Sequence, residues 1–420
     1  MGESKTKKII IVGGGAAGFF CAIRAAERAQ EMNRSVDIHI LEASDSVLKK
    51  VRISGGGRCN VTHHCFKPRD LVKNYPRGQK ELISVFHRFQ PQDTVDWFQK
   101  RGVVLKVEKD GRMFPTTDNS QTIIDCFLNE ARRLGVQVRM QSPVSEIKKE
   151  GSLFQLKIKD SFEPADCVMI ATGSQSSGHR LAQQLGHTIT ELAPSLFSFK
   201  IEDPLLKDLE GLSFEKAHLK LKFQGQEAQS GPALFEQSGP LLITHWGLSG
   251  PAILKLSAWC AREMKRAKDS AELKVNWLSF ANFEAAQENL RILKNQNLKS
   301  KISNVSVEGL PRRFWHRLLS IHQISLETKM SDLSHAQIRT LAEALFATPF
   351  QVLGKSRYKD EFVECGGVDL KEIDFKKMES RICPSLFFAG EVLDIDGITG
   401  GFNFQNAWSG AWIAAESMFL

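Results

Sequence analysis

Residues 7–18 read KKIIIVGGGAAG, a short apolar run that ends in a cluster of glycines. The run is rich in β-branched residues, as expected for a buried parallel strand. The next segment, FFCAIRAAERAQ (19–30), has helical spacing, and VDIHILE (36–42) is a second apolar strand that ends in an acid. This order of strand, glycine turn, helix and strand predicts a βαβ unit at the start of the chain.

The spacing of these glycines matches the G-x-G-x-x-G fingerprint, which binds the pyrophosphate of a dinucleotide. Gly13 permits the tight turn, Gly15 lets the backbone approach the phosphates, and Gly18 allows the helix to pack close to the strand. The helix N-terminus supplies N–H groups and a partial positive charge. Glu42 can accept hydrogen bonds from both ribose hydroxyls and would repel a 2′-phosphate, so the site favours FAD or NAD over NADP.

Composition limits the class of protein. The 420 residues are 42% apolar and carry a net charge of +8, enough chain for two or three domains and a charge that suits an anionic ligand. The basic residues are scattered, which argues against a dedicated nucleic-acid module. No run approaches the roughly 18 apolar residues that span a bilayer, and the polar start lacks a secretory signal, so we expect a cytoplasmic protein.

The cysteines and histidines do not predict a metal site. The eight cysteines include no C-x-x-C pair, which argues against a zinc ribbon or a thioredoxin-type motif. His63, His64 and Cys65 are adjacent in the chain, and three adjacent residues cannot all face one metal ion. We therefore expect no bound metal.

Two later strands are predicted to join the first sheet. ADCVMIATG (165–173) and SLFFAGEVLDIDG (385–397) are apolar strands that end in small residues. This arrangement resembles the FAD half of two-dinucleotide flavoproteins, in which the acid after the last Ala-Gly holds the ribityl chain. Glu391 matches that position, although Asp is more usual there. Since the first and last strands lie near the two ends of the chain, both ends must close one domain, and the residues between them form an insertion.

The insertion has two kinds of pattern. From about 192 to 276, alternating apolar stretches such as HLKLKF (218–223) and PLLITHWGLSG (240–250) indicate strands of a small barrel or sandwich. From about 277 to 345 the pattern becomes helical, and residues 350–367 look extended again. The chain is therefore expected to return through the barrel before it rejoins the first domain.

Several motifs together resemble the YhiN/BaiN-like flavoproteins, also described as the aminoacetone oxidase family. The resemblance runs nearly end to end and rests on GGGAAG, SGGGRCN, GRMFPTTDNSQTIIDCF, LLITHWGLSGPAILKLS, CGGVDLKEID and FFAGEVLDIDGITGGFNFQNAWSGAWIA. It implies a noncovalently bound FAD, a Rossmann-type FAD domain, a β-barrel insert and a nested helical insert. The sequence departs from the family in a shorter loop at 174–187 and in Leu48, where Gly is common.

The predicted fold class is α/β. It comprises a Rossmann-type FAD-binding domain, the glutathione-reductase-like FAD half, with an inserted β-barrel domain and a nested helical domain. The expected FAD-binding domain covers residues 1–191 and 363–420. The β-barrel domain is expected to cover 192–276 and 346–362, and the helical domain 277–345.

A second glycine loop, VRISGGGRCN (51–60), follows the fingerprint closely. Three glycines allow backbone N–H groups to lie against the flavin or the pyrophosphate. Arg58 can pair with phosphate or with a substrate carboxylate, or it can simply brace the fold, and Asn60 can donate and accept. Cys59 and Cys65 invite a redox disulfide over the flavin, but their spacing is one residue longer than in the disulfide reductases, so a positional role of the loop is favoured.

The C-terminal motif supplies a helix N-terminus near the flavin. Gly400 and Gly401 precede a helical pattern that begins near Phe402, and this end would stabilise negative charge on a reduced flavin. Asn403 and Gln405 can donate further hydrogen bonds. His245, in the barrel insert, is either an acid/base group or a structural residue beside a Trp.

The motifs and the resemblance together imply a set of cofactor-binding residues. The catalytic residue stays unknown, with His245, Arg58 and Cys59 as candidates. The cofactor-binding set is Gly13, Gly15, Ala16, Ala17, Gly18, Glu42, Ala43, Lys50, Ser54, Gly55, Gly56, Gly57, Arg58, Cys59, Asn60, Val144, Ala171, Thr172, Gly173, Gly390, Glu391, Asp396, Gly400, Gly401, Phe402 and Asn403.

The expected function is that of an FAD-dependent oxidoreductase that moves a hydride between a small-molecule organic substrate and flavin N5. NAD(P)H or oxygen is the expected electron partner. No second G-x-G-x-x-G follows a strand, so NAD(P)H would bind only transiently. One alternative is a flavoprotein that acts on or binds nucleic acid, as tRNA-modifying flavoenzymes do, and another is a non-catalytic FAD-binding protein. Neither nucleic acid nor membrane is the expected partner, and the sequence does not indicate an oligomeric state.

Overall fold

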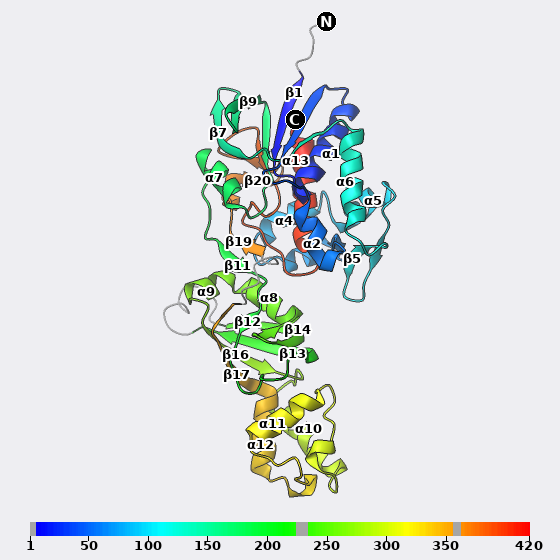
Figure 1. Ribbon diagram of the computed structural model, residues 1–420, viewed down its shortest axis with the longest axis vertical. Helices are drawn as coiled ribbons and strands as arrows, with labels where there is room; N and C mark the ends of the chain where they lie inside the picture. The colour runs from blue at the N-terminus through cyan, green and yellow to red at the C-terminus, as the bar shows by residue number, and fades with distance from the viewer. Residues whose placement is uncertain (1–5, 224–233, 356–362) are drawn as a thin grey trace. The chain divides into compact units, whose positions relative to one another are not determined.

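The computed structural model describes residues 6–223, 234–355 and 363–420. The chain forms two compact units, which are coloured along the chain in Figure 1. Unit 1 comprises Met1–Leu192 and Glu364–Leu420, and unit 2 comprises Ala193–Val363. Within the described residues, no helix is long and apolar enough to cross a membrane. The three-domain boundaries expected from the sequence stay a prediction.

Unit 1 contains the predicted βαβ unit, with β1 at Lys7–Val12, α1 at Ala16–Glu31 and β2 at Val36–Leu41. Its C-terminal helix begins at Phe402, as predicted. The other elements of the N-terminal segment are α2 (Lys49–Gly57), β3 (Thr62–His63), α3 (Pro68–Leu71), a 3₁₀ turn (Val72–Asn74), α4 (Gln79–Phe86), α5 (Pro91–Gln99), β4 (Leu105–Val107), β5 (Arg112–Pro115), α6 (Gln121–Arg133), β6 (Gln137–Arg139), β7 (Val144–Glu150), β8 (Leu153–Ile158), β9 (Ser161–Ala165), β10 (Cys167–Ile170) and α7 (Ser176–Gln184). The C-terminal segment adds β19 (Val363–Cys365), a 3₁₀ turn (Leu370–Glu372), β20 (Ile373–Asp374), β21 (Glu379–Ser380), β22 (Leu386–Phe388) and α13 (Phe402–Ser417).

The main sheet of unit 1 has the strand order β20-β21-β22-β10-β1-β2-β6. The strands β22, β10, β1, β2 and β6 pair in parallel, and the last four residues of the central strand β1 are apolar and buried because both faces of the sheet are covered there. Strand β22 comes from the end of the chain and pairs with β10, so the two ends of the chain close one sheet as predicted. A Rossmann-type fold is therefore confirmed for unit 1.

Two helices, α1 and α13, pack against each other and against strands of this sheet. Helix α1 follows the glycine fingerprint and packs along α13, which lies beside it in Figure 1. Helix α13 is apolar on nearly every side, and most of its residues are buried. Trp408 on α13 contacts Phe20 on α1, with ring centroids 5.4 Å apart. This contact joins α13 to α1 and forms part of the aromatic core between them.

Unit 2 contains a second sheet and several helices, and most of the strands and helices expected there are confirmed. The segment PAILKLSAW differs, since it forms a helix with Pro251 at its first position, where the missing proline N–H costs nothing. The elements are β11 (Ala193–Ser195), β12 (Phe199–Lys200), β13 (Ser213–Lys222), β14 (Leu234–Thr244), β15 (Gly247–Ser249), α8 (Pro251–Trp259), α9 (Ala261–Arg266), β16 (Ala271–Asn276), α10 (Phe283–Gln296), a 3₁₀ turn (Ile302–Asn304), α11 (Arg312–Ile321), a 3₁₀ turn (Met330–Asp332), α12 (His335–Ala347), β17 (Thr348–Val352) and β18 (Gly354–Lys355).

The predicted closed β-barrel in this insert is not confirmed. The sheet of unit 2 has the order β17-β16-β13-β14-β15-β12-β18, with β17 and β18 at its two ends. Both end strands belong to the segment 348–355, and Leu353 separates them. Among the described strands no ladder joins β17 to β18, so the pairing is that of an open sheet.

The helices of unit 2 share the core of this sheet. Phe314 on α11 lies with its ring centroid 4.4 Å from that of Trp277, and Trp277 in turn lies 4.6 Å from Phe214 on β13. Leu341 on α12 belongs to the same buried cluster. The nested helical domain is therefore not confirmed as a separate body, because its apolar faces are buried against the strands.

Three histidines of unit 1, His39, His179 and His187, are buried, and the pKa of the last two is lowered. His179, on α7, is 4% exposed, and neither ring nitrogen has a hydrogen-bond partner. His187 lies between Glu372 (2.9 Å) and Ser380 (2.8 Å). Burial lowers the pKa of both imidazoles, because the charged form loses its hydration.

Folding stability is expected to fall below about pH 6.5, the ordinary pKa of histidine. Since the pKa values of His179 and His187 are lowered in the native state, the unfolded chain binds protons below that pH which the native chain does not. Stability is therefore full above about pH 6.5 and is lost as the pH falls toward the lowered pKa values.

Urea unfolding across this pH range measures the effect. The variant His179→Leu should flatten the fall, whereas substitution of the exposed His335 by Gln should leave it unchanged. An equally steep fall in His179→Leu would contradict the assignment.

Candidate cofactor site

The turn between β1 and α1 is held by close backbone contacts. Gly13 has φ +113°, and a Cβ at this position would lie 2.5 Å from the carbonyl oxygen of Ala171 at the end of β10. A Cβ on Gly18 would lie 2.0 Å from the carbonyl oxygen of Gly13. Both positions therefore exclude every residue except glycine, as the fingerprint predicts.

Gly15 differs from these two glycines, because no contact within the chain requires a glycine at this position. Its backbone is extended, with φ −91°, and no atom lies within 4 Å of a Cβ built on it. It is the N-cap of α1, so Ala16 and Ala17 occupy the first turn, where backbone N–H groups have no partner within the helix. An open space above these N–H groups can accept a phosphate.

Glu42 lies beside the fingerprint, at the end of β2. One carboxylate oxygen accepts a hydrogen bond from the Gly14 N–H (2.8 Å), and the other accepts from the N–H (2.8 Å) and hydroxyl (2.7 Å) of Ser44. The neighbouring Ala43 is exposed, and the carbonyl of Glu42 accepts from the N–H of Ser142, shortly before Val144 on β7. The predicted ribose contact and its neighbours therefore lie at one end of the sheet.

A second group of predicted residues meets at the ends of β10 and β22. Ala171 pairs with Val12 through its N–H (2.8 Å), and Thr172 and Gly173 follow it. The Lys50 ammonium lies 2.5 Å from a carboxylate oxygen of Glu391, and a Cβ on Gly173 would lie within 4 Å of both groups. Gly390 abuts Ala17 in the first turn of α1. The structure thus brings the fingerprint, the Ala-Thr-Gly loop and the Ala-Gly-Glu loop together.

The second glycine loop is a left-handed run. Gly55, Gly56 and Gly57 have φ values of +58°, +69° and +83°, which only glycine adopts without cost, and they follow Ser54 at a kink in α2. A Cβ on Gly55 would meet the ring of Phe114 at 2.8 Å, whereas nothing lies within 4 Å of a Cβ on the next two glycines. Packing therefore explains one glycine of this loop and leaves open space above the other two.

Arg58 braces this loop. Its guanidinium lies 2.6 Å from Glu108 and 3.4 Å from Asp118, and it stacks 3.9 Å from the ring centroid of Phe114. The hydrogen bond to Glu108 and the attraction of both carboxylates raise the pKa of the guanidinium, so it stays charged. The bracing role is favoured over the phosphate or substrate role, because all three contacts hold the side chain toward β5 and its neighbours.

Cys59 is wholly buried beneath the loop. Burial raises the pKa of its thiol to about 12, so the thiolate is scarce near neutral pH. Cys65 is partly exposed, and both residues are free thiols. The hypothesis of a disulfide between them has no support in the structure.

Asn60 joins the second glycine loop to the start of α13. In the amide orientation that satisfies both groups, its oxygen accepts from the Gly401 N–H (2.9 Å) and its nitrogen donates to the Thr62 carbonyl (3.1 Å). A Cβ on Gly401 would lie 2.6 Å from the Thr62 carbonyl oxygen. The two segments that the sequence places at the flavin therefore lie side by side. Gly400 precedes this junction, and the carbonyl of Phe402 accepts from the buried Tyr75 hydroxyl (2.7 Å).

Other side chains of the C-terminal motif are already engaged within the chain. Asn403 accepts from the Gly397 N–H (2.7 Å) and donates to its carbonyl (3.0 Å), which fixes the preceding loop. Asp396 is wholly buried and forms a two-point ion pair with Arg77. Gln405 is also wholly buried, and its amide oxygen accepts from two threonine hydroxyls. The side chains of Asp396 and Gln405 thus have no exposed surface to offer a cofactor.

Sequence reasoning missed the partners that hold this site in place. Arg77, Tyr75 and Glu108 lie far in the sequence from the residues they contact, and no motif quoted above contains them. His245, the remaining candidate, lies in unit 2, where its imidazole is 80% exposed and 3.5 Å from Glu210. Its catalytic role stays a prediction. Within the described ranges, no group of three or more metal-ligating side chains is placed to hold an ion.

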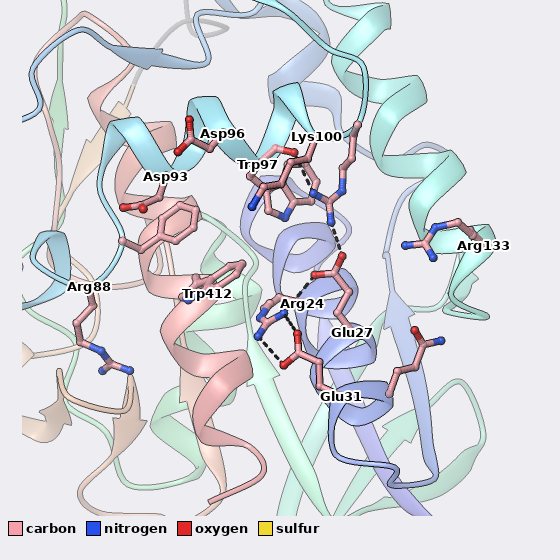
Figure 2. A pocket seen from close by; sticks show the side chains of 13 residues that line it. Arg24, Glu27, Glu31, Arg88, Asp93, Asp96, Trp97, Lys100, Arg133 and Trp412 are labelled. Atoms are coloured by element: carbon pink, nitrogen blue, oxygen red, sulfur yellow. Dashed lines mark hydrogen bonds and ion pairs between the residues drawn. The ribbon is translucent and has the colours of Figure 1, made fainter.

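A separate cleft of about 590 Å³ lies at the far end of α1, and Figure 2 shows the side chains around it. Arg24 binds Glu31 (2.7 Å) and stacks 4.3 Å from the ring centroid of Trp412, while Arg101 stacks 3.7 Å from that of Trp97. Arg24 also pairs with Glu416 on α13, and Arg101, just after α5, pairs with Glu27 on α1, so these contacts join α1, α5 and α13. The cleft starts at Arg24, nine residues beyond Gly15 and so about 14 Å along the helix, which separates it from the fingerprint.

The fold and the site together define a dinucleotide-binding flavoprotein with a single Rossmann-type nucleotide domain. The model of the HI0933-like protein Rossmann domain family matches residues 7–417, nearly the whole chain, and the protein belongs to this family. The resemblance to the YhiN/BaiN-like flavoproteins is thereby confirmed. The protein is an FAD-dependent oxidoreductase, as these family members are.

Proteins of known name are similar over their full length. An Escherichia coli (strain K12) protein named ribosomal RNA dihydrouridine synthase is 30% identical over 419 residues, which cover 97% of each chain. A Haemophilus influenzae protein of the same name is 27% identical and covers 99% of each chain. A Clostridium scindens protein named 3-dehydro-bile acid delta(4,6)-reductase is 27% identical and covers 98% of each chain.

The residues of the site fit FAD. The space above Gly15 faces the N-terminus of α1, as a pyrophosphate requires, and the space above Gly56 and Gly57 lies in the loop that Asn60 ties to α13. Glu42 and Glu391 are each partly exposed near these spaces, at the positions expected for ribose and ribityl hydroxyls. The individual cofactor contacts stay predictions.

The contrast between Gly15 and Gly18 can be tested by matched substitutions. Gly15→Ala meets no atom of the chain, so it should cost about 1 kcal/mol of stability or less while it raises the Kd of FAD about tenfold or more. Gly18→Ala should instead lower the free energy of unfolding by about 1–3 kcal/mol, because its Cβ clashes with the backbone. Chemical unfolding and fluorescence titration of the apoprotein with FAD measure both quantities. Unchanged FAD affinity in Gly15→Ala would refute the assignment of that space to the cofactor.

If Arg58 braces the loop, its partner Glu108 should contribute to FAD binding as much as Arg58 does. Glu108→Gln and Arg58→Ala should each weaken FAD binding, by roughly 2- to 10-fold, because each loosens the glycine loop. If Arg58 bound the cofactor directly, Glu108→Gln would leave the Kd unchanged. Fluorescence titration of the two variants separates these roles.

Proposed function

We propose that the protein reduces a carbon–carbon double bond that is conjugated to a carbonyl group. Two of the names among its relatives support this reaction. Dihydrouridine is uridine with the double bond of its uracil ring reduced, and a delta(4,6)-reductase of a 3-dehydro compound acts on double bonds next to a ketone. Both reactions add a hydride and a proton across the same kind of bond, so one site can serve either substrate.

The structural observation that supports this proposal is the junction of the second glycine loop with α13 through Asn60. When bound, FAD supplies the hydride. The chain supplies the open backbone of Gly56 and Gly57, over which a flat ring can lie without a clash. The N-terminus of α13 adds a partial positive charge, which stabilises negative charge nearby by roughly 0.3–2 kcal/mol.

The reaction also needs a proton donor and an electron donor. His245 stays our candidate for the proton donor, since Glu210, 3.5 Å from its imidazole, can orient the ring. NAD(P)H is the proposed electron donor, bound transiently because the chain carries one glycine fingerprint after a strand.

Uridine in ribosomal RNA is one candidate for the substrate of this reaction. Two full-length relatives carry that activity in their names, and the net charge of +8 suits a polyanion. This substrate reverses the expectation that nucleic acid is not a partner. A cyclic enone of steroid type is the alternative with the same chemistry.

Anaerobic flavin spectroscopy tests the proposal. NADH or NADPH should bleach the visible flavin band, and either a uridine-containing RNA or a cyclic enone should restore it, with a product two mass units heavier than the substrate. An RNA in which dihydrouridine replaces uridine is the matched control, because it lacks the double bond and should restore nothing. A reduced flavin that neither substrate reoxidises would reject the proposed reaction.

A further inference from the structure

An ion pair beside the predicted cofactor space joins three segments of unit 1. The Lys50 ammonium donates to Oε2 of Glu391 (2.5 Å) and lies 3.4 Å from the Ser174 hydroxyl. Lys50 belongs to α2, Ser174 to the loop after β10, and Glu391 to the loop after β22. The side chain of Lys50 therefore connects the element that carries the second glycine loop with both loops at the ends of the sheet.

The backbone on either side of Lys50 is anchored. Leu48 is buried, and its N–H donates to the carbonyl of Gly14 in the fingerprint (2.9 Å). Val51, the residue after Lys50, is wholly buried. The Lys50 side chain itself is 50% exposed, so the place of its ammonium depends on the contacts with Glu391 and Ser174.

The two oxygens of the Glu391 carboxylate differ in their contacts. Oε2 accepts from Lys50, and a Cβ on Gly173 would lie 3.8 Å from it. Oε1 accepts no hydrogen bond from the part of the chain that the structure describes. The Glu391 side chain is only 14% exposed, so its orientation is set mainly by the protein. One oxygen is thus held by Lys50, and the other is left for a hydroxyl donor.

We infer that Lys50 is a positioning residue, which holds Oε2 of Glu391 so that Oε1 accepts a hydrogen bond from the ribityl chain of FAD. An acceptor that is oriented before the ligand arrives loses less conformational entropy on binding. The carboxylate already neutralises the ammonium, so Lys50 acts through Glu391 and not as a phosphate ligand. This inference rests on the FAD site and is independent of the reaction proposed above.

The alternative role of Lys50 is direct binding of the pyrophosphate of FAD. The ammonium would then have to leave Glu391 when the cofactor binds, and Glu391 would lose its charge partner in a site that is largely closed to water. The N–H groups of α1 face the space above Gly15 and can bind phosphate without a side-chain cation. The two roles differ in which half of FAD depends on Lys50.

FAD and ADP separate these roles, because ADP carries the pyrophosphate but no ribityl chain. Fluorescence titration of the full chain freed of FAD gives the Kd of FAD, and competition gives that of ADP. Lys50→Met should raise the Kd of FAD about 3- to 10-fold and change that of ADP by less than about twofold. Lys50→Arg keeps a cation for Glu391, so it should restore most of the FAD affinity.

A double-mutant cycle gives an independent readout. Glu391→Ala should raise the Kd of FAD about tenfold or more, because it removes the acceptor itself. In that background Lys50→Met should have almost no further effect, since Lys50 acts through Glu391. Lys49→Met is the matched control, because the Lys49 ammonium pairs with the exposed Asp45 (3.2 Å), and it should leave the Kd of FAD unchanged.

Four results would overturn the inference. They are an unchanged Kd of FAD in Lys50→Met, an equal rise in the Kd of ADP, an undiminished effect of Lys50→Met beside Glu391→Ala, and loss of the fold in Lys50→Met. Chemical unfolding of the FAD-free variants measures the last, and we expect little change because the Lys50 side chain is half exposed.

The failure of this inference and that of the proposed function are distinguishable, because the titrations use oxidised flavin and no substrate. If Lys50→Met weakens FAD alone but neither RNA nor enone reoxidises the reduced flavin, the positioning role stands and the proposed reaction fails. If the flavin is reoxidised while Lys50→Met weakens FAD and ADP equally, the reaction stands and the positioning role fails.

Discussion

Gly13 lets two backbone segments touch, and the rest of unit 1 is arranged around that contact. A side chain there would lie 2.5 Å from the Ala171 carbonyl oxygen, so the β1 turn and the end of β10 can meet only through a glycine. Their approach places the N-terminus of α1 beside the ends of β10 and β22. The fingerprint, the Ala-Thr-Gly loop and the Ala-Gly-Glu loop consequently surround one region, where Lys50 and Glu391 form an ion pair.

The second glycine loop differs from the first in its backbone conformation and in what holds it. The first loop places the N-terminus of α1 against open space. The second loop turns the chain through Gly55, Gly56 and Gly57, all in the left-handed region, and leaves open space above Gly56 and Gly57. The loop is held from outside, by Arg58 on Phe114 and by Asn60 on the first turn of α13. Side chains on either flank thus hold the loop, and they leave the space above Gly56 and Gly57 open.

The central elements of unit 1 could be predicted because their signals are local. The apolar strand at 7–12, the glycine spacing and the acid at Glu42 lie within one short stretch, and the structure places them as expected. The ion pair of Asp396 could not be predicted, since its buried partner Arg77 lies 319 residues away and nothing in the sequence marks the pair. Arg58 had two readings for the same reason. In unit 2 the alternation that indicated strands was correct, but alternation does not reveal whether the outermost strands pair, so the barrel could not be decided.

The order of the two units along the chain has a consequence for folding during synthesis. A ribosome makes the chain from its N-terminus, and β22 and α13, which complete the sheet and the core of unit 1, emerge only after the whole of unit 2. Unit 2 is contiguous in sequence, so it can fold while the first strands of unit 1 still lack their partners. In the nascent N-terminal segment, the edge of β10 therefore stays exposed until β22 has been synthesised and pairs with it. A product that stops before β22 would keep that edge open, so the fold of unit 1 reports whether synthesis has passed unit 2.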